Sequence, residues 1–422
     1  MTEQYDVLVI GAGPAGLAAA QSAASHGARI GLIDAQALPG GQVWRHDIRR
    51  AAPRAARRAV STLKHVEWLA RHSVIAAEPH ALRVEHPDGA RLLRYDALVL
   101  ATGARELLLP FPGWTLPGVT GAGGLQALAK QGWPVAGKRV LVSGSGPLLL
   151  AAAATLRAHG AQLLGIHEQA PTSAVYSFAR QLLHWPARAV QAIALRTRLA
   201  GVAYQCGSFV RRAGGDGRLQ WVDVEGHAGV QRIECDLLAT GYGLVPNIEL
   251  ASLLGCALDT HGKHASVRVD ALLRTSMDGI HAAGEVCGIG GLAAARIEGA
   301  IAGYMAVGEQ GAAEALLPAR AKARRFAELL STHFALDPRL HALATPQTTI
   351  CRCEDVSLAA LDGYADARDA KLATRCGMGA CQGRICGSAL AELGRFPRRG
   401  FRTPLFPARL ASLAEAFPTL SD

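Results

Sequence analysis

The sequence lacks the features that mark several classes of protein. No alanine-rich stretch reaches about 18 apolar residues before Gly, His or Arg interrupts it, so we expect no direct membrane insertion. The first residues show no basic segment followed by an apolar core and a cleavage site, which predicts a cytoplasmic protein, membrane-associated only through partners. No dense Lys/Arg run is interleaved with aromatic residues, so the net charge of +10 does not indicate a nucleic-acid partner.

Aromatic residues are also scarce, at 5%, whereas glycine occurs 47 times in 422 residues. Many glycines and few aromatics are typical of α/β folds, in which tight turns join short elements. The length allows two or three domains, each with its own core. The 15 histidines are scattered and form no evident acid–base constellation, so we predict no catalytic residue.

What the sequence does contain begins with a strand, a glycine-rich turn and a helix. Residues 5–10 (YDVLVI) have the pattern of a buried strand, residues 11–16 are GAGPAG, and residues 17–20 (LAAA) begin a helix. This order is typical of a Rossmann unit, in which free N–H groups at the helix N-terminus bind phosphate. We therefore predict a dinucleotide site at this turn.

Individual residues of the segment suit that chemistry. Gly11 permits the tight turn, Gly13 lets the backbone approach a pyrophosphate, and Gly16 lets the helix pack on the strand. Residues 30–33 (IGLI) predict a second strand, which ends in Asp34. That carboxylate is placed to accept hydrogen bonds from an adenosine ribose.

Four segments together resemble the flavoproteins with two dinucleotide-binding domains, the glutathione and thioredoxin reductase type. They are GAGPAG at 11–16, PGGQ at 39–42, ATGA at 101–104 and GIHAAGEV at 279–286. The resemblance implies an α/β fold that binds FAD. Carried over by position, the FAD-binding residues are Gly11, Gly13, Pro14, Ala15, Gly16, Asp34, Ala35, Gly41, Gln42, Thr102, Gly103, Gly284 and Glu285. Most members carry Asp where this chain has Glu285, which keeps the charge but lengthens the reach.

A second Rossmann pattern occurs in the middle of the chain, inserted into the first. Residues 138–143 (KRVLVS) predict a strand, GSGPLL follows at 144–149, and Glu168 ends the next strand. Leu149 stands at the third glycine position, where a side chain separates the helix from the strand or crowds a pyrophosphate. Two interpretations stay open: the unit binds NAD(H) or another adenine nucleotide, or it is a relic that serves as structure.

Reductases of this type that work through a disulfide carry a Cys-x-x-Cys pair beside the flavin. Residues 1–340 contain no such pair. Five of the nine cysteines instead lie close together, at Cys351, Cys353, Cys376, Cys381 and Cys386. In a reducing compartment such a cluster indicates metal binding or redox work. A [2Fe–2S] cluster needs four thiolates, whereas zinc ribbons favour Cys-x-x-Cys pairs that are absent here.

This stretch resembles the small bacterioferritin-associated-ferredoxin-like (BFD-like) [2Fe–2S] domain. Residues 351–354 (CRCE) and 377–386 (GMGACQGRIC) match the variant fused to flavoprotein subunits of amino-acid and opine dehydrogenases. Carried over by position, the cluster ligands are Cys351, Cys353, Cys381 and Cys386. Cys376 stands where that pattern often has Ala, although Cys376 and Cys381 have the same spacing as Cys381 and Cys386.

The order of all these segments, with WTLPGV at 114–119, resembles the FAD-dependent α (A) subunits of heteromeric amino-acid and opine dehydrogenases. The group includes subunits of opine oxidase, hydroxyproline or proline dehydrogenase and hydrogen cyanide synthase. The resemblance implies that an amine is oxidised on a separate flavoprotein β subunit, while this chain relays electrons through FAD and the cluster. It also allows a small ferredoxin-like subunit, and an interfacial FMN as in heterotetrameric sarcosine oxidase. The alternative is a free-standing NADH-dependent ferredoxin or acceptor reductase.

These segments predict three parts. The FAD-binding domain is discontinuous and comprises residues 1–115 and 240–320, and the second Rossmann domain comprises residues 116–239. The BFD-like domain and its tail comprise residues 340–422, after a helical linker around residues 312–341.

Overall fold

The structure is a computed structural model that describes residues 2–63, 65–398 and 400–414, and it divides into two compact units. Unit 1 consists of Met1–Arg105, Pro246–Ala327 and Arg399–Asp422, and unit 2 consists of Glu106–Val245 and Glu328–Arg398. The chain enters unit 2 in β7 (Ala104–Glu106) and leaves it in β16 (Leu244–Pro246). The predicted α/β fold is confirmed.

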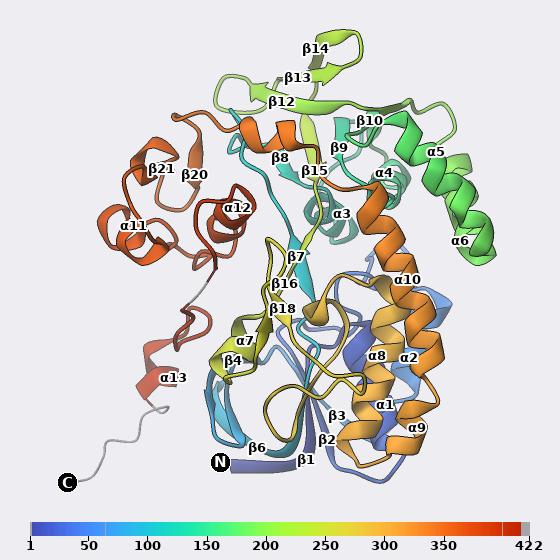
Figure 1. Ribbon diagram of the computed structural model, residues 1–422, viewed down its shortest axis with the longest axis vertical. Coiled ribbons are helices and arrows are strands. Elements are labelled where there is room, and N and C mark those ends of the chain that lie inside the picture. Colours follow the sequence, from blue (N-terminus) through green and yellow to red (C-terminus); the bar gives the residue numbers. More distant parts are fainter. Residues whose placement is uncertain (1, 64, 399, 415–422) are drawn as a thin grey trace. The chain divides into compact units, whose positions relative to one another are not determined.

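Unit 1 is built on a seven-stranded sheet (Figure 1). Its order is β3-β2-β1-β6-β5-β4, with β19 paired to β6. The strands are β1 (Thr2–Ile10), β2 (Ile30–Asp34), β3 (Val66–Ala70), β4 (Ser73–Glu78), β5 (Ala81–His86), β6 (Gly89–Leu100) and β19 (Ile280–Ala282). The pairs that involve β1, β2, β3 and β19 are parallel, whereas β4 and β5 continue the sheet antiparallel.

Alternate residues of β1 serve two cores, because successive side chains of a strand point to opposite faces. Val7 and Val9 pack into the core that contains residues of α1 and α8, and Leu8 and Ile10 pack into the core on the other face. The helices of the unit are α1 (Pro14–Ala24), α2 (Arg54–Ser61), α7 (Glu249–Leu253), α8 (Gly291–Ala306), α9 (Gln310–Glu314) and α13 (Leu410–Ala414). The short strands β17 (Leu258–Asp259) and β18 (Ser266–Val267) form a hairpin.

Unit 2 contains a five-stranded parallel sheet in the order β11-β10-β9-β15-β8. The strands are β8 (Val119–Gly121), β9 (Arg139–Gly144), β10 (Gln162–Glu168), β11 (Tyr204–Cys206) and β15 (Leu237–Gly241). The α-helices of its first segment, Glu106–Val245, are α3 (Ala122–Lys130), α4 (Leu148–Ala158), α5 (Thr172–Gln181) and α6 (Pro186–Arg198). The unit also contains a separate antiparallel sheet of β12 (Phe209–Gly214), β13 (Trp221–Gly226) and β14 (Gly229–Glu234).

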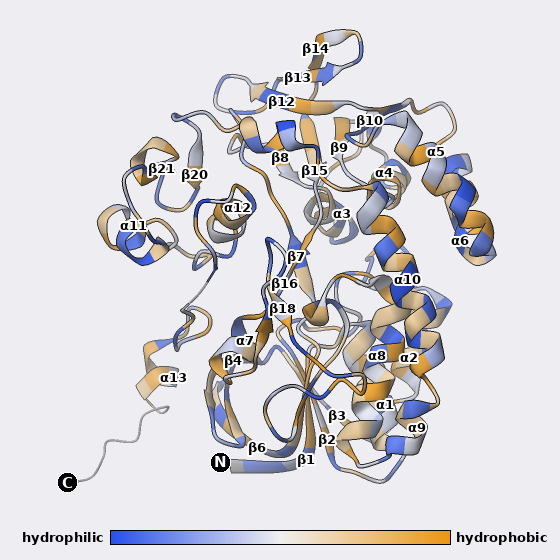
Figure 2. Ribbon diagram, viewed as in Figure 1, coloured by the Kyte–Doolittle hydropathy of each residue, from blue (hydrophilic) through white to orange (hydrophobic). Residues whose placement is uncertain are grey.

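The helical linker is α10 (Leu317–His333), which contains both hydrophilic and hydrophobic residues along its length (Figure 2). The cysteine-rich stretch folds into β20 (Thr349–Cys351), β21 (Val356–Ser357), α11 (Ala367–Thr374) and α12 (Cys386–Glu392). This small domain packs within unit 2. The Trp114 indole N–H donates to the Thr349 carbonyl oxygen (2.6 Å), and Leu343 and Ile385 pack against the core that contains Trp114.

The tail after the cysteine-rich stretch belongs to unit 1. Leu405 lies in a core of that unit, and Arg409 forms an ion pair with Glu85 (3.1 Å). The predicted range 340–422 therefore has residues in both units, and the predicted domain bounds stay predictions. Among the helices that the structure describes, none combines the length and apolar character that crossing a bilayer requires.

Candidate functional site

The turn between β1 and α1 has the geometry that a dinucleotide requires. Gly11 has a φ of +104°, and a Cβ there would lie 2.3 Å from the Ala101 carbonyl oxygen. A Cβ at Gly16 would lie 1.7 Å from the Gly11 carbonyl oxygen, so only glycine lets the helix approach the strand. Pro14 occupies the first turn of α1, and no described side chain caps the helix at Gly13. Its N–H groups therefore suit a phosphate.

Asp34 ends β2 beside this turn, as predicted. Its Oδ2 accepts a hydrogen bond from the Ala12 N–H (2.7 Å), and its Oδ1 accepts one from the Gln36 N–H (2.8 Å). The side chain is half-buried and Ala35 is exposed next to it. Because a carboxylate offers about four acceptor positions, these two bonds orient Asp34 and leave positions for ribose hydroxyl groups.

The PGGQ segment lies against the same turn. The Gly40 N–H donates to the Ala12 carbonyl oxygen (2.8 Å). The backbone of Gly41 lies so close to that of Gly13 that a Cβ on Gly41 would come within 2.8 Å of the Gly13 Cα. Gln42 follows with an exposed side chain. The structure thus brings the first two predicted FAD segments together.

The ATGA segment is held by a residue that no motif indicated. Asn247 donates from Nδ2 to the Thr102 carbonyl oxygen (2.8 Å), and its own carbonyl oxygen accepts from the Thr102 Oγ1 (2.8 Å). Its N–H also donates to the Gly103 carbonyl oxygen (3.0 Å). Arg105 pairs with the buried Glu249 (2.7 Å) next to this clasp. These residues lie about 145 positions apart, so only folding brings them together.

In the final predicted FAD segment, the Glu285 carboxylate is bound by the backbone of this chain. Its carboxylate accepts hydrogen bonds from the N–H groups of Gly290 (3.0 Å) and Gly291 (2.8 Å) at the start of α8. The neighbouring Gly284 N–H donates to Glu298 Oε2 (3.1 Å). Glu285 therefore orients the helix that follows it, and its contact with FAD stays a prediction.

Glu298 is a further acid that the sequence did not single out. It is fully buried on α8 and pairs with Arg320 (3.1 Å) and Arg324 (2.6 Å) of α10. Arg324 also donates from Nη1 to the Gly288 carbonyl oxygen (3.0 Å). This buried network holds the segment around Gly284 against α8 and α10.

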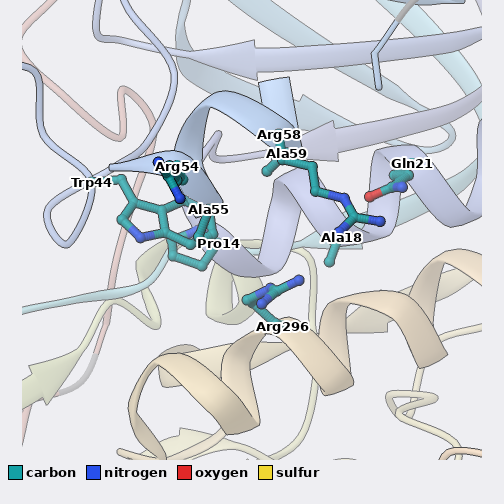
Figure 3. A pocket seen from close by; sticks show the side chains of 9 residues that line it. All are labelled: Pro14, Ala18, Gln21, Trp44, Arg54, Ala55, Arg58, Ala59 and Arg296. Carbon is teal, nitrogen blue, oxygen red and sulfur yellow. The ribbon is translucent and has the colours of Figure 1, made fainter. Parts of the chain in front are cut away.

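A cavity of ≈ 490 Å³ opens beside the first turn, between α1, α2 and α8 (Figure 3). Pro14 lines it near the helix start, and Arg54, Arg58 and Arg296 bring three guanidinium groups to it. The Arg296 guanidinium lies 6.0 Å from the centroid of the Trp44 ring. The residues that line the cavity within the described chain include no carboxylate, so its potential is positive and suits an anion.

The five C-terminal cysteines converge on one place. The Sγ atoms of Cys351, Cys376 and Cys386 lie within 4.8 Å of one another, and all three residues are buried. The Cys381 thiol hydrogen-bonds with Cys386 and with Cys353, and Cys353 is exposed. Of the four predicted ligands, Cys351 and Cys386 lie in this close group together with Cys376, whereas Cys381 and Cys353 are linked to it through hydrogen bonds. Which four would bind a cluster stays a prediction.

The backbone around these thiols suits a thiolate-bound group. The Gly377 N–H donates to the Cys351 Sγ (3.4 Å), and such N–H···S bonds stabilise bound thiolate and tune a cluster's potential. A Cβ on Gly379 would lie 2.2 Å from the Cys353 Cβ, so only glycine lets the backbone at position 379 pass this close to Cys353. The hydrogen bond between Cys386 and Cys381 lowers the pKa of the Cys381 thiol and raises that of the Cys386 thiol, so the two thiols share one proton.

The second Rossmann unit departs from the first at Leu149. Its side chain is fully buried and packs in the core with Val142 and Ile166. It therefore fills the space beneath α4, where the first unit has glycine.

Residues 5–305 match the pyridine nucleotide-disulphide oxidoreductase family. The chain is 33% identical to the A subunit of opine oxidase from Rhizobium meliloti (strain 1021), over 97% of this chain and 98% of that protein. It is 31% identical to the HcnB subunit of hydrogen cyanide synthase from Pseudomonas aeruginosa, over 95% of this chain and 96% of that protein. L-proline dehydrogenase from P. horikoshii has a similar fold (TM-score 0.72, 21% identity, 98% of this chain and 80% of that chain).

Proposed function

Because the chain belongs to the pyridine nucleotide-disulphide oxidoreductase family, and within it to the group of HcnB and the opine oxidase A subunits, we propose a role in a heteromeric dehydrogenase. In this proposal the chain is the FAD- and [2Fe–2S]-containing electron-transfer subunit of an amine or amino-acid dehydrogenase. A partner flavoprotein β subunit oxidises the amine, which is an opine, hydroxyproline, proline or glycine.

One observation carries the proposal: a dinucleotide turn and a group of five cysteines occur in one chain that has no Cys-x-x-Cys pair in residues 1–340. A flavin without a redox disulfide needs another route for its electrons. The five cysteines of unit 2 can supply the ligands of a [2Fe–2S] cluster, and such clusters carry single electrons.

The roles of this chain's own residues follow from their positions. The N–H groups at the start of α1 bind the pyrophosphate, and Asp34 binds the ribose. FAD, when bound, supplies the chemistry of exchanging electron pairs with single-electron carriers. Cys351, Cys353, Cys381 and Cys386 would hold the cluster, which would supply single-electron transfer, and the exposed Cys353 would lie on its solvent-facing side.

The test is to purify the chain alone and after co-expression with the proteins encoded beside it. We expect bound FAD, iron and sulfide in the chain alone, but dye reduction by an amine only in the complex. A panel of an opine, hydroxyproline, proline and glycine then identifies the substrate. Amine-dependent dye reduction by the chain alone would contradict the proposal. Cofactor extraction from the complex tests the interfacial FMN, and its polypeptide composition tests the small ferredoxin-like subunit.

A further inference from the structure

The fold of the second Rossmann unit implies a nicotinamide nucleotide as its ligand. A dinucleotide needs three things at the turn after β9: an open approach to Gly146, free N–H groups, and a free carboxylate at the end of β10. In the structure the Phe334 ring lies at the approach to Gly146, the Gly146 N–H is bonded to Glu168, and the Glu168 carboxylate is fully buried.

The carboxylate is already bound by the protein. Glu168 is fully buried, and its Oε2 accepts from the Gly146 N–H (2.7 Å) and the Tyr204 hydroxyl (3.2 Å). Its Oε1 accepts from the Ala170 N–H (2.9 Å). Burial also raises the pKa of Glu168 to about 7, which weakens it as an acceptor for ribose. In the first unit, by contrast, Asp34 is half-buried and accepts two backbone bonds.

The turn itself is covered by the linker that follows α10. The Phe334 ring stands over Gly146, where a Cβ would lie 3.6 Å from the Phe334 Cγ. The Ser145 hydroxyl donates to the Phe334 carbonyl oxygen (2.9 Å). The same ring packs edge-on against Phe178 of α5, with 5.0 Å between centroids. The approach that a pyrophosphate would use is thus taken by the linker.

Gln169 holds the linker in place. Its Nε2 donates to the Ala335 carbonyl oxygen (3.0 Å) and to the Ser145 Oγ (2.9 Å), and its Oε1 accepts from the Asp337 N–H (2.9 Å). The side chain is 2% exposed, so these bonds are formed away from water and are costly to leave unmade. Beyond Asp337 the linker continues into the core through the buried Leu340.

We propose that residues 334–337 occupy the position of the nucleotide in the second Rossmann unit, so that this unit binds neither NAD(H) nor another adenine nucleotide. The unit is instead the platform on which the linker carries the cysteine-rich domain. Reducing equivalents therefore do not enter this protein from a nicotinamide. The inference concerns unit 2 alone and does not depend on the proposed dehydrogenase function.

The experiment measures hydrogen–deuterium exchange and flavin absorbance in the full-length protein with its cofactors bound. In the wild type, millimolar NADH or ADP leaves the exchange of residues 144–149 unchanged, and NADH does not bleach the flavin. In a Phe334→Ala/Gln169→Ala variant, exchange at residues 144–149 becomes about tenfold faster, because the turn opens more readily once the linker no longer covers it. Tyr176→Ala, on an exposed side chain of α5, is the matched control and leaves that exchange unchanged.

Either of two results would overturn the proposal. One is protection of residues 144–149 by ADP or NADH in the wild type, abolished by Glu168→Gln. The other is an unchanged exchange rate in the folded double variant, which would mean that the linker does not close the turn. The wild-type measurement decides the question even if the double variant does not fold.

Discussion

Five cysteine side chains meet in the small C-terminal domain, whereas a [2Fe–2S] cluster takes four thiolates. Cys376 is buried between Cys351 and Cys386, yet it stands where the related pattern often has Ala. Alanine at position 376 lacks the thiol and leaves the backbone unchanged. The choice between Cys376 and the exposed Cys353 is therefore a question for single substitutions.

We predict that Cys376→Ala retains the iron and sulfide of the wild type and that Cys353→Ser loses most of both. The measurement is iron and sulfide per FAD, with the visible spectrum of the oxidised cluster. If Cys376→Ala loses the cluster and Cys353→Ser keeps it, Cys376 is the ligand and the predicted set is wrong.

The fully buried carboxylate of Glu298 pairs with two arginines. Glu298→Ala leaves Arg320 and Arg324 without that carboxylate, so the free energy of unfolding falls by ~3 kcal/mol. Chemical denaturation measures the change. Glu314→Ala removes an exposed acid of α9 and is the control, with little expected effect. Equal losses in the two variants would show that the buried network does not stabilise the fold.

At the scale of elements, α2 places positive charge beside the first dinucleotide turn. Arg54 and Arg58 lie one helical turn apart and line the same cavity as Pro14, at the start of α1 (Figure 3). Neither is part of the glycine motif. Their positive charge attracts an anionic cofactor at separations shorter than the Debye length, where dissolved salt does not screen the attraction.

We therefore predict that Arg58→Gln raises the dissociation constant of FAD about twofold to fivefold, or ~0.5–1 kcal/mol. The effect should shrink at high salt. Titration of the apoprotein with FAD at two ionic strengths measures it. Arg188→Gln, on α6, changes the net charge equally and serves as the control. A loss of affinity that is independent of salt would point to a packing role for Arg58.

At the scale of the whole molecule, burial makes stability depend on pH. Burial lowers the pKa of His281 from 6.5 to about 4, and its side chain lies in β19 of the central sheet of unit 1. Between these pH values the unfolded chain binds a proton that the folded chain does not. The stabilisation is therefore complete above about pH 6.5 and is lost as the pH falls towards 4.

The expected slope from this histidine is at most about 1.4 kcal/mol per pH unit. His281→Gln should flatten the pH dependence of the unfolding free energy by that amount, and His261→Gln, whose side chain is 92% exposed, should not. An unchanged slope in His281→Gln would mean that other groups dominate acid unfolding. Unit 2 is less suitable for this measurement. Burial raises the pKa of Glu168 and lowers that of the adjacent His167, so the two groups change the unfolding free energy with pH in opposite directions.

Contiguous segments of the sequence were enough to predict the α/β fold, the first dinucleotide turn and the family. The reason is local: Gly11, Gly16 and Asp34 act through the backbone geometry of one βαβ unit, which the sequence order alone specifies. The cysteine-rich domain was predictable for the same reason, since its thiols and glycines recur within 36 residues, from Cys351 to Cys386.

Only the tertiary structure decided the contacts between distant segments. The clasp of Asn247 on Thr102, the pairing of Glu298 with α10, and the closure of the turn at Gly146 by Phe334 each join residues that no local pattern relates. The sequence left open whether Glu168 binds a ribose or serves the structure alone. Its burial and the three hydrogen bonds that the folded chain donates to it distinguish the two, because a carboxylate enclosed by the protein and bonded to it is not accessible to a ribose.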